Sequence, residues 1–291
     1  MTGTPLAGYL TRHQTPAGPR WALDGRYLPV SLTLAELLAA PLAEMVRQLH
    51  QAPVGEVATE PLLAPVEPDQ EVWASGVTYL RSRDAREAES SARDVYARVY
   101  NAERPELFFK AIGRRVVGPG GVVGIRYDSS WDVPEPEIVL VVNSALEIVG
   151  YCAGNDMSSR SIEGENPLYL PQAKTYDRSC ALGPGIRLAP AEELAALQVR
   201  LSIWRAGAVV FAGETRAAQM RRRFTELVHY LGRALSFPYG ALLMTGTGIV
   251  PPESFTLQPG DRVEIRVGDL ALVNDVAMTP DRRPEREARR A

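Results

Sequence analysis

Three carboxylates near the middle of the chain have the types and spacing of a metal-binding group. Glu135 and Glu137 are two residues apart in a stretch rich in β-branched residues, 135–142, and side chains two apart on a strand point to the same face. A second strand-like stretch, 147–153, leads to Asp156. If the two stretches form a hairpin, Asp156 lies nearly opposite Glu135, and cross-strand neighbours are about 5 Å apart.

Carboxylates gathered this closely repel one another unless a cation neutralises them. Hard divalent ions such as Mg²⁺, Mn²⁺ or Ca²⁺ take all-oxygen ligands of this kind. Taken alone, the Glu-x-Glu pair is more typical of the solvent-facing side of an exposed strand. The third carboxylate on the partner strand favours the metal-binding interpretation, with Glu135, Glu137 and Asp156 as ligands.

Composition and charge exclude several classes of protein. The 291 residues are 45% hydrophobic and 23% charged, which is typical of a soluble globular chain. A formal charge of −3 provides no basic field for nucleic acid. No apolar stretch reaches the roughly 18 residues of a membrane span, and no secretory pattern opens the chain, so we expect a cytoplasmic protein. Cysteine and histidine are too scarce for a zinc site.

The segments that must position these carboxylates predict an α+β chain that is mainly β. Residues 1–66 are expected to form a small N-terminal domain, with a helical stretch at 33–51 that is interrupted near Pro41. Residues 67–279 alternate short β-rich stretches with Gly and Pro turns, which favours antiparallel β-structure with inserted helices. Residues 280–291 are almost free of apolar side chains and are expected to be a disordered charged tail.

Seven short motifs, taken together and in order, resemble the C-terminal domain of the fumarylacetoacetate hydrolase family. The resemblance covers residues 72–274. The motifs are Gly76-Val77-Thr78-Tyr79, Phe108-Phe109-Lys110, Glu135-Pro136-Glu137, Asn155-Asp156-Met157-Ser158-Ser159-Arg160, Lys174-Thr175-Tyr176-Asp177, Leu182-Gly183-Pro184 and Thr245-Gly246-Thr247-Gly248.

This resemblance implies a mixed β-roll that binds Mg²⁺ through Glu135, Glu137 and Asp156, with Mn²⁺ or Ca²⁺ as other candidates. It also implies a catalytic role for Lys174 and for Thr247, which contacts substrate as well. The family's substrates are small 2-oxo acids, and a divalent ion on the 2-oxo oxygen would acidify the neighbouring carbon. Family likeness further implies a homodimer or a higher homo-oligomer.

The chain departs from the hydrolases of the family at one informative position. Ser82 stands where those hydrolases carry a water-activating histidine. The segment 163–172 and the loop 245–252 instead resemble the branch that dehydrates 2-keto-3-deoxy pentonates of the xylonate and arabinonate type to 2-oxoglutarate semialdehyde. Dehydration requires no activated water, so the sequence predicts a Mg²⁺-dependent hydro-lyase, with Ser82 among the substrate-binding residues.

Other polar residues are candidates for the same site. Arg81 and Arg83 could bind a carboxylate or hydroxyls, or could simply be solvated on a charged helix. Lys110 and Asp177 belong to the matching motifs and are also expected to bind substrate. Glu163 and Glu165 lie in a segment that could close over substrate, with Glu165 as the catalytic acid, or could form an ordinary polar loop.

Two other functions remain open at this stage. The first is an acylpyruvate-type C–C hydrolase or an oxaloacetate decarboxylase whose base is another residue, such as Glu87 or Glu89. The second is a ligand-binding or assembly module without turnover, which three mutually repelling acids disfavour.

Overall fold

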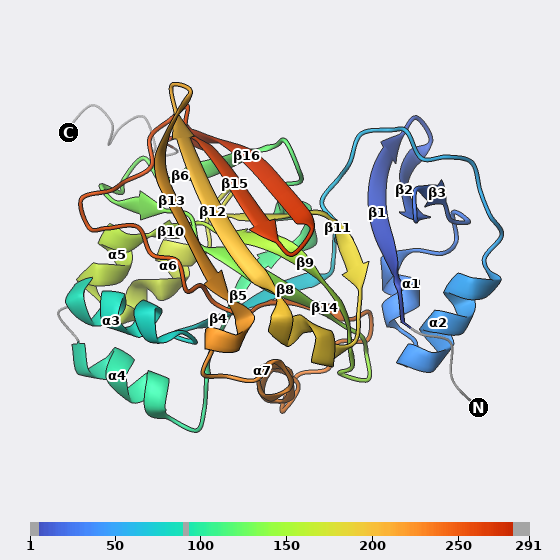
Figure 1. The fold of residues 1–291 in the computed structure, drawn as a ribbon, viewed down its shortest axis with the longest axis horizontal. Helices are drawn as coiled ribbons and strands as arrows, with labels where there is room; N and C mark the ends of the chain where they lie inside the picture. The colour runs from blue at the N-terminus through green and yellow to red at the C-terminus, as the bar shows by residue number, and fades with distance from the viewer. Residues whose placement is uncertain (1–5, 90–92, 282–291) are drawn as a thin grey trace.

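The computed structural model describes residues 6–89 and 93–281. Within these ranges it describes every side chain except those of residues 85–89 and 93–94. Within this part of the chain, two large sheets and a short ribbon form the frame (Figure 1). Across the larger sheet, the strands are β3 (Arg26–Tyr27), β2 (Gly18–Leu23), β1 (Gly8–Thr15), β11 (Cys180–Leu188), β9 (Ile148–Asp156), β8 (Pro136–Val142), β14 (Ala241–Met244), β4 (Glu71–Gly76) and β5 (Glu106–Ile112).

The second sheet covers one face of the first. Its strands are, in order, β13 (Ala208–Arg216), β12 (Gln198–Arg205), β15 (Arg262–Val267), β16 (Leu270–Met278) and β6 (Val122–Ile125). The ribbon pairs β7 (Asp132–Val133) with β10 (Ser158–Ser159). Most pairs are antiparallel, but β14 with β4 and β16 with β6 are parallel. The prediction of a mainly β, α+β chain with mixed sheets is therefore confirmed.

Helices fill the connections between strands. The α-helices are α1 (Leu34–Leu38), α2 (Leu42–Gln51), α3 (Leu80–Glu89), α4 (Arg93–Asn101), α5 (Arg160–Glu165), α6 (Leu170–Lys174) and α7 (Phe224–Leu231). The 3₁₀ helices are η1 (Gly113–Arg115), η2 (Pro167–Tyr169), η3 (Ala191–Ala196) and η4 (Ala217–Gln219). Among the described residues, no helix is both long and apolar enough to cross a membrane.

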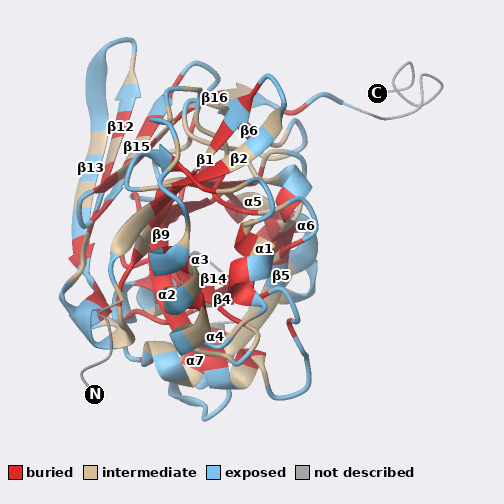
Figure 2. Cartoon of the chain, turned by 90° about the vertical axis from the view of Figure 1, so that its right-hand side faces the viewer, coloured by how far each residue is buried: buried red, intermediate tan, exposed pale blue. Residues whose placement is uncertain are grey.

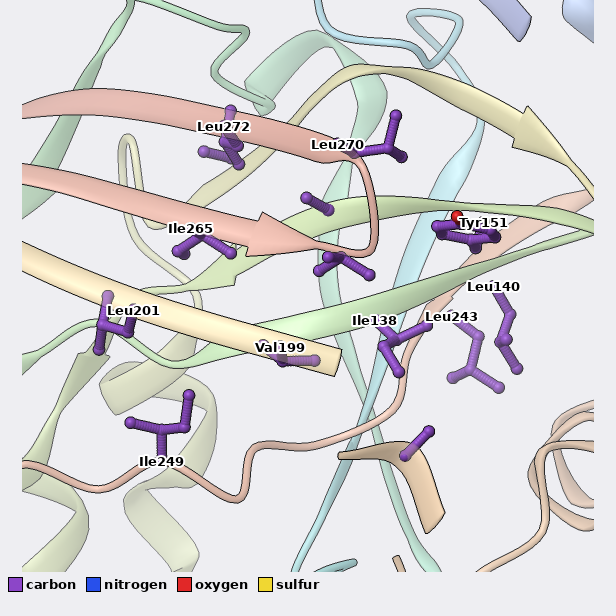
Figure 3. Packing of buried hydrophobic residues seen from close by; sticks show 14 of the residues in the cluster. Ile138, Leu140, Tyr151, Val199, Leu201, Leu243, Ile249, Ile265, Leu270 and Leu272 are labelled. Atoms are coloured by element: carbon purple, nitrogen blue, oxygen red, sulfur yellow. The ribbon is translucent and has the colours of Figure 1, made fainter. Parts of the chain in front are cut away.

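The strands that carry the carboxylates are buried on both faces. Along β8, Ile138 and Leu140 point into the core between the two sheets, whereas Val139 and Val141 point to the opposite side, beneath α1. Ile138 and Leu140 belong to one cluster with residues of the second sheet, and Figure 3 shows Ile138 beside Val199 of β12. Each such side chain contributes roughly 1.5–3 kcal/mol when fully buried. In Figure 2, β9 is red throughout and β13 is largely pale blue, so the site is built on the most buried strands.

The N-terminal segment is joined to the rest of the molecule by strand pairing and by a shared core. β1 pairs with β11 and so extends the larger sheet, and Leu10 and Leu37 pack in one cluster with Val139 and Cys152. The proposed boundary at 66 thus falls between segments that share one continuous sheet, whereas the proposed boundary at 279 follows β16, the last described strand. The predicted tail falls almost entirely on residues 282–291, which lie outside the described part of the chain.

One predicted loop is helical. Apart from Asn166, residues 163–172 lie within α5, η2 and α6. The Ser159 side chain accepts a hydrogen bond from the Ile162 N–H at the start of α5, and Pro167 and Pro171 stand in the first turns of η2 and α6. Proline is tolerated there because the first helical N–H groups need no helical partner. The two prolines in this stretch therefore mark the starts of helices.

Candidate active site and metal centre

The candidate site lies at one end of the larger sheet, where five adjacent strands begin or end. There β4, β9 and β14 end, and the oppositely directed β5 and β8 begin. The helices α3, α5 and α6 gather beside this end (Figure 1). Side chains from sequence positions as far apart as 75 and 247 are therefore brought together by strand order.

The carboxylates of Glu135, Glu137 and Asp156 meet at this end. One oxygen from each lies within 4.8 Å of the others, and all three side chains are buried. The β8–β9 hairpin produces this arrangement, because Pro136 pairs with Asn155 and the Asp156 N–H donates to the Glu135 carbonyl at 3.0 Å.

Each carboxylate contacts a buried donor from a different element. These contacts are Arg160 Nη2 to Glu135 Oε1 at 2.9 Å, the Gly246 N–H to Glu137 Oε2 at 2.6 Å, and Lys110 Nζ to Asp156 Oδ1 at 2.5 Å. Such contacts fix carboxylate rotamers, so the remaining oxygens are held in a constant arrangement.

Lys174, the last residue of α6, connects two of the carboxylates. Its Nζ lies 2.7 Å from Glu135 Oε2, 3.0 Å from Asp156 Oδ2 and 2.6 Å from the Ser158 hydroxyl. The side chain is 2% exposed, and its ammonium lies 5.7 Å from the centre of the Phe108 ring. It thus places a buried positive charge at the edge of the acidic cluster.

The charge of this cluster is suited to a divalent cation. Burial raises the pKa of the Glu137 carboxyl well above its ordinary value, and the nearby Asp156 and Glu135 carboxylates raise it further, whereas Lys174 and the Gly246 N–H lower it. A cation among the three oxygens would favour the ionised form. Three buried carboxylates with no histidine or cysteine among them form a hard donor set, which fits Mg²⁺.

A cavity opens beside the acidic cluster. Its lining residues are Ser75, Gly76, Val77, Ser82, Glu106, Phe108, Glu135, Asp156, Glu163, Leu170, Lys174, Gly246 and Thr247. Ser82, Lys174 and Thr247, predicted from the sequence as site residues, are therefore brought together with the carboxylates. The Thr247 hydroxyl also interacts with the backbone of Ile249.

Five other candidates lie outside this lining. Glu165 and Asp177 are exposed, Arg81 is exposed and donates to the Val250 carbonyl at 3.4 Å, Arg83 pairs with Asp84, and Lys110 is fully buried behind Asp156. Glu165 lies outside the cavity lining because a helix turns by about 100° per residue. From Glu163 to Glu165, two residues along α5, this rotation turns the Glu165 side chain away from the cavity. Glu163 itself does line the cavity. Glu87 and Glu89 lie where side chains are not described.

Glu106 is the cavity carboxylate that sequence reasoning missed. It begins β5 and shares one face with Phe108 and Lys110, since alternate residues on a strand point the same way. Its carboxylate packs directly against the backbone of Gly76, where an added Cβ would meet Glu106 Oε2 at 2.0 Å. The signal in the sequence that could have identified Glu106 is this alternation, Glu-x-Phe-x-Lys, which ends in the matching motif Phe108-Phe109-Lys110.

Two backbone loops beneath the cavity interlock. The Thr78 hydroxyl donates to the Thr245 carbonyl at 2.7 Å, and the next residue, Gly246, adopts a φ of +91° and donates its N–H to Glu137. Val77 adopts a φ of +54°, which costs a β-branched residue about 1–3 kcal/mol. The fold therefore maintains a strained turn where the cavity is formed.

Asp132, on β7, is a buried carboxyl close to the site. Burial raises its pKa to about 6, while Ser129 and the nearby Arg126 lower it. Within the described residues, its Oδ1 has no hydrogen-bond partner. A folded-state pKa above the unfolded value of 3.8 means that folding favours the protonated form. The resulting stabilisation is therefore lost as the pH rises through about 6.

We expect Asp132→Asn to stabilise the protein more at pH 8 than at pH 5. The variant has no carboxyl to ionise, so its advantage in free energy of unfolding should grow by about 1–1.5 kcal/mol over this range. Denaturant unfolding of both proteins at the two pH values measures this difference. If the variant exceeds the wild-type protein in free energy of unfolding by the same amount at both pH values, Asp132 does not titrate as described.

Fold and site together define a class of protein. Residues 71–277 match the family described as fumarylacetoacetate (FAA) hydrolase C-terminal, and the chain belongs to this family. It is 45% identical over 256 residues to a probable 2-keto-3-deoxyxylonate dehydratase of Haloferax volcanii, covering 87% of this chain and 86% of that protein. It is 41% identical over 216 residues to the 2-dehydro-3-deoxy-D-arabinonate dehydratase of Saccharolobus solfataricus, covering 72% of each.

A solved structure supports the same relationship. The 2-keto-3-deoxy-D-arabinonate dehydratase complexed with magnesium and 2,5-dioxopentanoate superposes with a TM-score of 0.77 at 32% identity. The match covers 94% of this chain and all of that one. The resemblance predicted from the motifs, including its dehydratase branch, is confirmed.

Proposed function

We propose that this protein is a Mg²⁺-dependent dehydratase that converts a 2-keto-3-deoxy pentonate of the xylonate or arabinonate type to 2,5-dioxopentanoate, which is 2-oxoglutarate semialdehyde. The observation that carries the proposal is the composition of the cavity. Its lining combines Glu135 and Asp156 of the three-carboxylate cluster and the buried Lys174 with Ser82 and two further acids, and no histidine is among its described lining residues. Relatives with dehydratase names at 45% and 41% identity support it.

Glu135, Glu137 and Asp156 are the proposed ligands of the ion. Bound there, Mg²⁺ would act as a Lewis acid on the 2-oxo group and so acidify the C3 proton of the substrate. Lys174 supplies a second positive charge within 3.0 Å of two of these carboxylates. It is suited to stabilise negative charge on the substrate's carboxylate or 2-oxo oxygen.

Glu106 and Glu163 are the proposed proton carriers. They reach the cavity from different elements, β5 and α5, so they can act on different atoms of one substrate. One takes the C3 proton and the other donates a proton to the departing C4 hydroxyl, which leaves as water. Transfer of a C5 proton to C3 then gives an enol with a double bond between C4 and C5. This enol becomes the C5 aldehyde when its hydroxyl loses a proton and C4 gains one. Ser82 and Thr247 also line the cavity and are the proposed partners of the substrate hydroxyls.

The experiment supplies purified protein and Mg²⁺ with 2-keto-3-deoxy pentonates of both C4 configurations in deuterated water. We expect 2,5-dioxopentanoate that carries deuterium at C3 or C4, detected by NMR. An acylpyruvate and oxaloacetate are assayed in parallel. Rapid release of pyruvate from either, without dehydration of a sugar acid, would replace this proposal by the hydrolase or decarboxylase function.

Two further features belong to the proposal. A homodimer or higher homo-oligomer and a cytoplasmic location are expected from membership of the family. Light scattering of the purified protein and fractionation of the source cells are the corresponding measurements.

A further inference from the structure

Lys110 and Lys174 are the only lysines in the chain, and all its other basic side chains, apart from histidines, are arginines. Both lysines are buried, and both contact the carboxylate of Asp156. An ammonium is compact and carries three donors, whereas a guanidinium is planar and larger. Lysine is therefore present only at the two positions where a compact cation meets this carboxylate. Lys174 reaches the cavity, but Lys110 does not.

The contacts of Lys110 join three parts of the site. Its Nζ lies 2.5 Å from Asp156 Oδ1, donates to the Met157 carbonyl at 3.0 Å, and donates to the carbonyl of Lys174. These partners belong to the end of β9, the residue that follows it and the end of α6, whereas Lys110 itself belongs to β5. One ammonium thus ties a candidate metal ligand to the backbone of the other lysine.

The two lysines hold opposite oxygens of one carboxylate. Lys110 contacts Asp156 Oδ1 and Lys174 contacts Asp156 Oδ2, so together they fix the plane of that group. The helix that carries Lys174, α6, has only five residues. So short a helix has little stability of its own, and its position depends on contacts such as the one from Lys110 to its last carbonyl.

We infer that Lys110 is a positioning residue, which orients Asp156 and holds the end of α6 so that Lys174 reaches the cavity in the reactive arrangement. Its fully buried side chain acts through these two residues and does not touch substrate. The kinetic part of this inference rests on the proposed dehydratase function. The structural part concerns only Lys110, Asp156 and Lys174.

The kinetic test uses Lys110→Met, which keeps the length and apolar character of the side chain but removes the ammonium. We expect kcat to fall about 10- to 100-fold, the usual scale for groups that orient metal ligands, while KM changes little because the cavity-lining side chains remain. Lys110→Arg should not restore kcat, because the guanidinium does not fit the two carbonyl oxygens and one carboxylate oxygen arranged around one nitrogen. Phe109→Leu, at a partly exposed neighbour on β5, is the matched control and should retain kcat.

The second test follows the lysines directly, without substrate. Protein labelled with ¹³C at lysine Cε gives one resonance for each lysine, and Lys174→Met assigns them. In the wild-type protein, addition of Mg²⁺ alone should shift the Lys110 resonance, because Asp156 contacts it. In Lys110→Met, the remaining Lys174 resonance should differ from its wild-type position.

Two results would overturn the inference. One is a folded Lys110→Met protein with wild-type kcat and an unmoved Lys174 resonance. The other is a wild-type Lys110 resonance that is unchanged at saturating Mg²⁺. If the Lys110→Met protein does not fold, this Mg²⁺ titration of the wild-type protein is by itself the test of the inference. If the wild-type protein dehydrates no sugar acid, the proposed function fails, whereas the lysine spectra still test the role of Lys110.

Discussion

Asp156→Asn is expected to remove nearly all turnover while the protein still folds. The substitution keeps the size of the side chain but removes one of three anionic oxygens that lie within 4.8 Å of one another. The two remaining carboxylates bind a divalent cation more weakly. When the cation is lost, the positive charge that it supplies to the reaction is lost as well. We expect kcat/KM to fall on the order of 10³-fold, because such electrostatic contributions are worth several kcal/mol.

Three measurements separate this effect from misfolding. Dehydration rate, Mn²⁺ affinity by calorimetry and thermal unfolding are compared for the wild-type protein and the variant. Asp177→Asn is the matched control, because Asp177 belongs to a neighbouring motif but is exposed and outside the described cavity lining. Wild-type activity of Asp156→Asn, or full activity of the wild-type protein in excess chelator, would refute the metal site.

The acidic cluster could be predicted from the sequence because its geometry is local. Glu135 and Glu137 share a strand, and Asp156 follows on the adjacent strand of one hairpin, so period-2 alternation and one turn bring them together. The β-rich stretches that become β8, β9, β12 and β15 are also continuous in sequence. By contrast, β11 contains Gly183-Pro184-Gly185, and its strand signal is correspondingly weak.

The remaining cavity residues depend on non-local packing. Glu106 approaches the cluster only because β5 lies at the edge of a sheet whose order, β8-β14-β4-β5, does not follow the sequence. The choice between Glu163 and Glu165 depends on α5, where the sequence favours a loop. Lys110 was expected to bind substrate, but its burial behind Asp156 follows from the position of α6 against β5. Such relations come from long-range strand pairing, which motif spacing does not encode.

Glu106→Gln and Glu163→Gln are each expected to lower kcat by about 10²–10⁴-fold, the range for a positioned acid or base. Both side chains line the cavity, and glutamine keeps their shape but cannot accept or donate the proton. Glu165→Gln is the matched control, two residues from Glu163 on the same helix but exposed, and should retain wild-type kcat. Turnover of C3-deuterated substrate assigns the roles, because a variant that lacks the C3 base should show the larger kinetic isotope effect. If Glu165→Gln loses activity and both cavity variants keep it, the proton carriers are not the acids that line the cavity, and the orientation of α5 toward substrate must differ from that described.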